Sequence, residues 1–239
     1  MDVALHQPGF LPWAGFWHKA ASSDVMGLYT GVQFDQHDFQ HRVRLNGGWL
    51  TLPVETGSGS RIIRDVKLSP EFPAALKKTV ETLRQNCMSR KNKHGYRLEA
   101  IVGTLSRWNR SWLSDLNIEL IEQVVKVLGI STRFVEYGVP REGTTTSKLN
   151  HSLNFVTKGQ PCNYLSGPSG RDYLVSSELR HPQATWFQKV VEGTSTDTVL
   201  QLIASHDDPL SVIKACAIWE THGGTAREAA DIGYSTTRG

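Results

Sequence analysis

The sequence predicts an α/β fold in which a mainly parallel sheet is flanked by helices. Strand-like runs alternate with amphipathic helical stretches along the chain, as expected where helices cover a parallel sheet. The 239 residues suffice for one large domain or two small ones. A hydrophobic content of 39% and a net charge of only +3 exclude a disordered chain.

The first elements follow from apolar runs and the prolines and glycines between them. Residues 2–6 are predicted to form a strand that ends before Pro8, because proline cannot donate to a sheet ladder. A helix is expected over residues 13–22. Residues 25–33 are apolar enough for a buried strand.

A hairpin and two further elements are predicted next. Residues 43–54 contain two strand segments joined at Asn46-Gly47-Gly48, a sequence typical of tight hairpin turns. Residues 62–68 are expected to form another strand. Ser69 then suits the N-cap of a helix with Pro70 at its first position.

The clearest helix covers residues 114–128, where apolar side chains recur with a period of 3.6 and Gly129 supplies the stop. A strand is predicted over 130–137. A second amphipathic helix is predicted over 146–158. A short strand over 162–165 then runs into a Gly/Ser loop.

The rest of the chain is expected to be helical, over residues 198–206 and 210–221. We therefore expect a Rossmann-like α/β catalytic domain over residues 1–180. Residues 181–239 would form a helical C-terminal extension packed on it, with a tail beyond Gly223 that frays.

Composition also bears on localisation and redox chemistry. No apolar run approaches the ~18 residues of a spanning helix, and the N-terminus lacks the pattern of a secretory signal. The 3 cysteines are odd in number and widely spaced, which argues against a disulfide framework or a CxxC metal site. These features predict a cytoplasmic protein without a membrane span.

The first candidate site is the loop from His6 to His18, directly after the first strand. In open α/β sheets, ligands bind beyond the carboxyl ends of the strands. His6 and His18 can transfer protons near neutral pH, and Gln7 can both donate and accept hydrogen bonds. Trp13 adds an aromatic surface. A rigid turn in which one histidine is merely packed is the structural alternative.

The second candidate is the polar stretch from Gln33 to Asn46. Arg42 and Arg44 share one face of a strand, and two guanidinium groups there suit a phosphate or carboxylate. Two solvated arginines on an edge strand are an equally good interpretation. His37 and His41 are four residues apart, but this spacing converges on zinc only in a helix, so no metal site is predicted.

The third candidate is the loop after the strand at 162–165. A strand that runs into a Gly/Ser loop and then a helix exposes backbone N–H groups to an anion. The candidate binding residues of this loop are Ser166, Gly167, Ser169, Gly170, Arg171 and Tyr173. The spacing matches neither the P-loop nor the dinucleotide fingerprint, and a plain surface turn is the alternative.

A basic window separates these loops. Between Arg84 and Arg110 the chain has seven basic residues and one acid, a local charge of +6, interleaved with Tyr96, Trp108 and Trp112 nearby. Basic stretches with aromatic residues can bind nucleic acid, although a solvated helix face has the same composition. A nucleic-acid partner therefore stays open beside a small anionic ligand.

Taken together, these residues resemble the WbqC-like protein family. The resemblance rests on the opening His6–Trp17 segment, on residues 32–34, 39–42 and 49–54, and on the 164–174 loop, and it runs in order over about residues 2–180. Ser147-Lys148-Leu149 also matches, so Lys148 joins the candidate binding residues. His41 departs from the pattern, since an Asn is expected before the Arg.

The resemblance implies a transferase associated with surface-polysaccharide biosynthesis that attaches aminoacyl or acyl groups to amino sugars. It does not imply which residue is catalytic, nor a cofactor or an oligomeric state. Carried over by position, the matching polar and loop residues are His6, Gln7, Arg42, Ser166, Gly167, Gly170, Arg171 and Tyr173.

We therefore expect a group-transfer enzyme whose acceptor carries phosphate, such as a nucleotide-linked amino sugar. Its catalytic candidates are His6, Gln7 and His18. The binding candidates are Trp13, Gln33, Arg42, Arg44, Lys148 and the residues of the third loop. A nucleic-acid base-modifying or binding protein that uses the same pocket is the main alternative, and a non-enzymatic scaffold is the other. All three hypotheses need the first and third loops to meet in one pocket.

Overall fold

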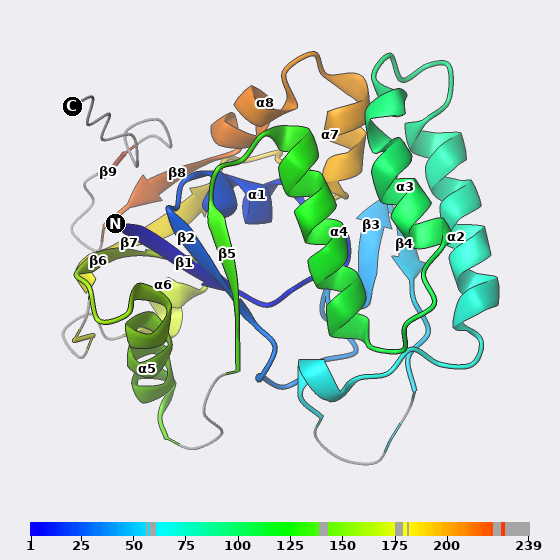
Figure 1. The fold of residues 1–239 in the computed structure, drawn as a ribbon. Coiled ribbons are helices and arrows are strands. Elements are labelled where there is room, and N and C mark those ends of the chain that lie inside the picture. The colour runs from blue at the N-terminus through cyan, green and yellow to red at the C-terminus, as the bar shows by residue number, and fades with distance from the viewer. Residues whose placement is uncertain are drawn as a thin grey trace.

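The structure, a computed structural model, describes residues 1–55, 57, 61–138, 143–174, 179–180, 182–221 and 226–227. Its centre is a seven-stranded sheet in the order β5-β2-β1-β6-β7-β8-β9 (Figure 1). The strands of this sheet are β1 (Asp2–His6), β2 (Val25–Tyr29), β5 (Arg133–Tyr137), β6 (Cys162–Ser166), β7 (Pro182–Val190), β8 (Ala217–Glu220) and β9 (Ala226–Arg227).

Successive strands are added first on one side of β1 and then on the other. From β1 the chain builds outward through β2 and β5 and then returns to add β6 and β7 on the other side, all parallel. The pairs β7–β8 and β8–β9 are antiparallel, so among the described strands of this sheet β8 alone runs in the opposite direction. The predicted Rossmann-like α/β class with a mainly parallel sheet is confirmed, and the switch point between β1 and β6 is where such sheets bind ligands.

Helices cover both faces of the sheet, and their apolar faces make two cores. The helices are α1 (Ala14–Ala21), α2 (Phe72–Cys87), α3 (Glu99–Ser106), α4 (Leu113–Leu128), α5 (Thr145–Thr157), α6 (Gly170–Tyr173), α7 (Val199–Ser205) and α8 (Pro209–Ala215), with two 3-10 turns at Ile63–Asp65 and Gly95–Leu98. None of the helices described is both long and apolar enough to cross a membrane.

Alternation along β1 and β2 distributes side chains between the two cores. Val3 and Leu5 pack with Leu153 of α5 on one face. Ala4 and Met26 face the larger core, which the remaining long helices complete. In Figure 1, α2, α3, α4 and α7 stand together beside the sheet, while α5 lies apart from them.

Several predicted elements are confirmed. The strand at 2–6, the helix over 146–158 and the strand at 162–165 appear within one or two residues. Asn46 and Gly47 have φ angles of 51° and 76° and join β3 (Arg42–Leu45) to β4 (Gly48–Thr51), as a type I′ hairpin turn requires. Gly129 ends α4 in the left-handed conformation, with φ of 66°.

Other predictions are wrong. Residues 62–68 contain a 3-10 turn and single bridges instead of a strand, since their backbone groups bond to scattered loops. The helix after Ser69 begins at Phe72, with Pro73 in its first turn. The tail beyond Gly223, except Ala226–Arg227, lies outside the described residues.

The C-terminal part is less helical than predicted. The helix expected over 210–221 ends at Ala215, and residues 217–220 form β8. β7, which was not predicted, pairs with β6 and carries the sheet into this part of the chain. Polar residues within β7, such as Gln188, weaken the local strand pattern, so pairing with β6 and β8 decides its conformation.

Candidate functional site

A cavity of about 510 Å³ opens at the carboxyl ends of β1, β2 and β6, beside the switch point between β1 and β6. We call it the switch-point cavity. It brings together the first and third candidate loops, which are about 160 positions apart in the sequence. Its lining includes His6, Gln7, Gly9, Pro12, Trp13, Lys19, Tyr29, Asp38, Phe39, Gln40, Thr145, Tyr164, Ser166, Gly167, Pro168 and Ser169.

One wall is the loop after β1, and buried hydrogen bonds hold it in place. Asn117 of α4 is fully buried and donates to the carbonyl of Pro8 at 3.0 Å and to that of Gln40 at 2.7 Å. The Gln40 amide in turn donates to Gln7 Oε1 at 2.5 Å. This network ties the loop to the 38–40 segment, so Gln7 is oriented before any ligand binds.

The other wall is the loop after β6. A Cβ on Gly170 would lie 1.9 Å from Ser166 Oγ, so glycine at this position leaves the space that the Ser166 side chain occupies. Ser166 itself is buried, and Gly167 and Ser169 line the cavity. These residues therefore meet Gln7 and Trp13 in one cavity, as expected for a shared site.

His6 lies at the floor of the cavity, at the end of β1. Its ring makes an edge-on contact with Phe16, with 5.1 Å between the ring centroids. Burial, and to a smaller extent the charge of Lys19, lower the pKa of His6 to about 3, against a small opposing effect of its bond to Gln7. Nδ1 lies 2.8 Å from the Gln7 carbonyl, which can only accept, so the neutral ring is assigned its proton on Nδ1.

The sequence analysis missed several residues of this lining, and Lys19 is the charged one among them that lies deepest in the fold. It lies on α1 with only 3% of its surface exposed, lines the cavity, and donates from Nζ to the Leu5 carbonyl at 3.0 Å. Burial lowers its pKa to about 7. A lysine within the otherwise largely apolar run 14–21 was the pattern that could have identified it.

His18 faces away from this cavity. It is fully buried and accepts at Nδ1 from Gln188 Nε2 at 2.9 Å, and its ring packs 5.2 Å from that of Trp219. Burial lowers its pKa to about 4. It does not line the switch-point cavity, because adjacent residues of a helix point in directions about 100° apart and Lys19 occupies the cavity side.

The arginines of the second candidate lie on the hairpin outside the cavity. Arg42 stacks on Trp49 with its guanidinium 4.3 Å from the ring centroid, and it bonds to the His37 carbonyl. Arg44 lies 5.8 Å from the same ring. Gln33, which is exposed, and Lys148 on α5 are also absent from the lining.

Arg171 is also turned away from the cavity. Its guanidinium pairs with Glu220 at 2.8 Å and lies 5.4 Å from the ring centroid of Phe187. Its neighbour Tyr173 ends α6, but its side chain lies outside the described residues. The glycine loop thus contributes its backbone and serines to the cavity, while its arginine contacts β8.

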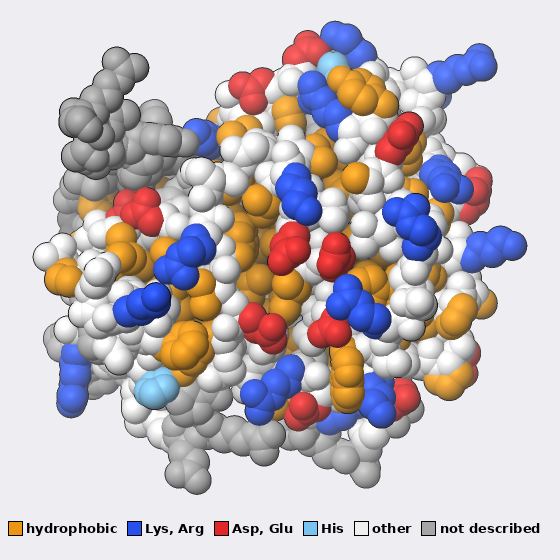
Figure 2. Space-filling view, in the orientation of Figure 1, with side chains coloured by type: hydrophobic (Ala, Val, Ile, Leu, Met, Phe, Trp, Pro, Cys, Tyr) orange, Lys and Arg blue, Asp and Glu red, His pale blue; other side chains and the backbone are white. Residues whose placement is uncertain are grey.

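Part of the basic window is engaged within the molecule. Lys93 pairs with Asp207 at 2.9 Å, Arg97 donates to the carbonyls of His206 and Asp207, and Arg110 pairs with Glu119 at 3.5 Å. On the face drawn in Figure 2, Lys and Arg side chains are interspersed with Asp and Glu and form no single basic stripe.

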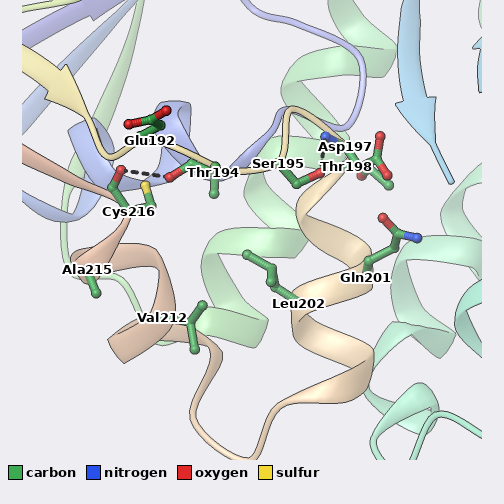
Figure 3. A pocket seen from close by; sticks show the side chains of 12 residues that line it. Glu192, Thr194, Ser195, Asp197, Thr198, Gln201, Leu202, Val212, Ala215 and Cys216 are labelled. Carbon is green, nitrogen blue, oxygen red and sulfur yellow. Dashed lines mark hydrogen bonds between the residues drawn. The ribbon is translucent and has the colours of Figure 1, made fainter. Parts of the chain in front are cut away.

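A second cavity, of about 350 Å³, lies between the 192–198 loop, α7 and α8 (Figure 3). We call it the α7–α8 cavity. Its charged lining residues are Glu192 and Asp197, and Thr194 donates to the Cys216 carbonyl at 3.2 Å. Within the described ranges, no three His, Cys, Asp or Glu residues are grouped to hold a metal ion.

Comparison with known proteins identifies the family. The model of the WbqC-like protein family matches residues 7–190, which include both walls of the switch-point cavity. An uncharacterized protein of Mycobacterium tuberculosis, Rv1507c, is 25% identical over 205 residues, which cover 77% of this chain and 81% of the relative. No solved structure matches the chain significantly. The chain belongs to the WbqC-like protein family.

Proposed function

We propose that the protein is a group-transfer enzyme that attaches an acyl or aminoacyl group to the amino group of a phosphate-bearing acceptor, such as a nucleotide-linked amino sugar. The observation that carries the proposal is the switch-point cavity, in which the two candidate loops meet at the carboxyl ends of parallel strands. Its volume of about 510 Å³ falls in the range of small-molecule sites.

The composition of the cavity favours an anionic ligand with an apolar or aromatic part. Lys19 supplies an amine that can carry a positive charge, and Ser166 and Ser169 add hydroxyl groups to the lining. Trp13 and Phe39 offer aromatic surfaces that suit the ring of a sugar or base. A phosphate near Lys19 and a sugar against these rings is the arrangement that the lining supports.

The transfer needs a group that removes a proton from the attacking amine. The amine nitrogen forms a bond to the acyl carbon, the bond from that carbon to its leaving group breaks, and the nitrogen loses one proton. His6 holds its unprotonated Nε2 for this role.

The test is to incubate the protein with nucleotide-linked amino sugars and with thioester or aminoacyl-adenylate donors, and to search for acylated products by mass spectrometry. His6→Ala should lower turnover at least tenfold, since a positioned base contributes roughly 10²–10⁴-fold. His206→Ala, at an exposed histidine after α7, should leave turnover unchanged. No product from any amine acceptor would contradict the proposal.

A nucleic-acid base is the second candidate acceptor. It is supported by the exposed Arg84, Arg90 and Lys91 and by Tyr96, which is 64% exposed on the same segment. Binding of single-stranded DNA that weakens steeply with salt would favour this acceptor over a sugar nucleotide. The internal contacts of Lys93, Arg97 and Arg110 favour the small molecule.

A further inference from the structure

Lys19 is a buried amine whose charged form lacks a counter-ion in the described part of the chain. The ion pairs found there involve other residues, and none places a carboxylate beside Lys19 Nζ. Its one hydrogen bond goes to a neutral acceptor, the Leu5 carbonyl. A buried ammonium group without an opposite charge is unfavourable, so its presence at a cavity wall requires an explanation.

The surroundings of Lys19 leave room for an anion. A Cβ built on Gly167 would lie 3.8 Å from Nζ, so the amine faces the loop after β6 at close range. The bond to Leu5 uses one of the three donors of an ammonium group. The remaining donors can bind a group held between β1 and this loop.

The other titratable groups of the cavity do not neutralise Lys19. They are His6, Tyr29, Asp38 and Tyr164. His6 is neutral, because its pKa is near 3, and the two tyrosines carry phenol hydroxyls rather than carboxylates. The Asp38 carboxylate accepts from the Phe39 amide at 2.7 Å and from the Gln40 side chain at 3.1 Å. It is thus bound to the opposite wall.

We infer that Lys19 is the anion receptor of the switch-point cavity, and that an anionic group of the ligand binds against its amine together with a proton taken up from solvent. In the free protein the amine is largely neutral above pH 7, since burial lowers its pKa to about 7. The bound anion supplies the missing charge and favours the ammonium form, so binding at pH 8 is accompanied by uptake of up to one proton. The inference rests on the proposed function only for the class of ligand.

The first experiment follows Lys19 itself by NMR titration of its ε-methylene group, with and without sulfate, whose charge is constant from pH 6 to 10. Sulfate should raise the pKa of Lys19 by about one unit or more, because an adjacent anion stabilises the charged amine. Lys77, an exposed lysine on α2, is the internal control and should show no such change. An unchanged pKa of Lys19 overturns the inference.

The second experiment measures binding of uridine diphosphoglucose by calorimetry in two buffers of different ionisation enthalpy. Lys19→Met should weaken binding about tenfold to a hundredfold, as for loss of a charged hydrogen bond, and should abolish proton uptake at pH 8. Lys19→Arg, which stays protonated, should bind without proton uptake. Lys77→Met is the matched control with unchanged affinity.

Two further outcomes separate this inference from the proposed function. Wild-type affinity in a folded Lys19→Met variant overturns the anion receptor and leaves group transfer intact. A response of Lys19 to sulfate without any binding of the sugar nucleotide supports the receptor and removes the uridine nucleotide as ligand. Circular dichroism and the unfolding midpoint establish that each variant is folded.

Discussion

Two cavities of this molecule, the switch-point cavity and the α7–α8 cavity, are similar in scale but differ in the ionisable groups that line them. The switch-point cavity has a buried lysine and a histidine at its floor, and its single carboxylate is held at the opposite wall. The α7–α8 cavity has two carboxylates and no basic residue in its lining (Figure 3). An anion in the first cavity can therefore pair with a protonated Lys19, whereas the two carboxylates of the second cavity repel it.

The comparison teaches that volume alone does not make a site. Both cavities are concave, but only the first joins strand ends that the topology brings to one edge of a parallel sheet. Backbone groups and side chains from distant segments converge there, because the parallel strands that carry these segments end at the same edge of the sheet. The second cavity is a gap between two short helices and a loop.

The largest expected effect is the change of stability with pH that the titration of Lys19 causes. Its pKa of about 7 in the folded protein lies below the ordinary 10.5, so between these values the unfolded chain binds the proton and the folded chain does not. The free energy of unfolding of the free protein therefore rises with pH above 7, by up to about 1.4 kcal/mol per unit. Lys19→Met should abolish this rise and stabilise the protein by up to about 4 kcal/mol at pH 7.

Urea unfolding between pH 6.5 and 9.5 measures this dependence. Asp197→Asn in the α7–α8 cavity is the control, and its free energy of unfolding should rise with pH as steeply as that of the wild type. If the free energy of unfolding rises equally with pH in the wild type and in Lys19→Met, the lysine is not buried as a neutral amine.

The next effect is a loss of stability when the loop after β1, one wall of the switch-point cavity, loses its hydrogen bonds to Asn117. Asn117→Ala removes the donors to the Pro8 and Gln40 carbonyls and should destabilise the protein by about 2–5 kcal/mol, the cost of two buried acceptors left unpaired. Gln123→Ala on the same helix loses one bond to Glu119 and should cost less than about 0.5 kcal/mol. Chemical denaturation compares the two, and similar losses would mean that the loop after β1 does not depend on Asn117.

The two histidines from the first candidate loop sharpen the contrast between site and core. His6→Ala should weaken binding of uridine diphosphoglucose about tenfold with a small loss of stability, since His6 lines the cavity. His18→Ala should keep the affinity and lose about 2–4 kcal/mol of stability, because it empties a buried position against Trp219. Calorimetry and thermal unfolding separate the two, and the reverse pattern would place the ligand on the other side of α1.

The smallest effect is expected in the α7–α8 cavity. Thr194→Val keeps the shape of the side chain and removes its bond to the Cys216 carbonyl, at a cost of about 0.5–1.5 kcal/mol. Affinity for the sugar nucleotide should be that of the wild type. A change in affinity would make this cavity part of the site.

Local sequence patterns predicted the elements whose conformation is decided locally. The turn at Asn46-Gly47, the stop at Gly129 and the single apolar face of α4 each follow from nearby residues. β7 and β8 were missed because pairing with distant strands decides them. The same difference applies to residues 62–68, where a 3-10 turn and isolated bridges to distant residues replace the predicted strand.

The candidate site shows the same division. The loops after β1 and β6 were chosen because each follows a predicted strand of an α/β sheet, and the two loops do share a cavity. The directions of side chains did not follow, because a guanidinium or imidazole turns toward whatever partner the fold supplies. Arg171 turns toward Glu220 and His18 toward Gln188, whereas Lys19, adjacent to His18, faces the cavity.

The most direct test of the central claim is a crystal structure of the protein with bound uridine diphosphoglucose. We predict the diphosphate in the switch-point cavity, between Gln7 and Gly167 and within hydrogen-bond distance of Lys19 Nζ. A diphosphate bound instead at Arg42 and Arg44, or in the α7–α8 cavity, with the switch-point cavity empty, would contradict the account.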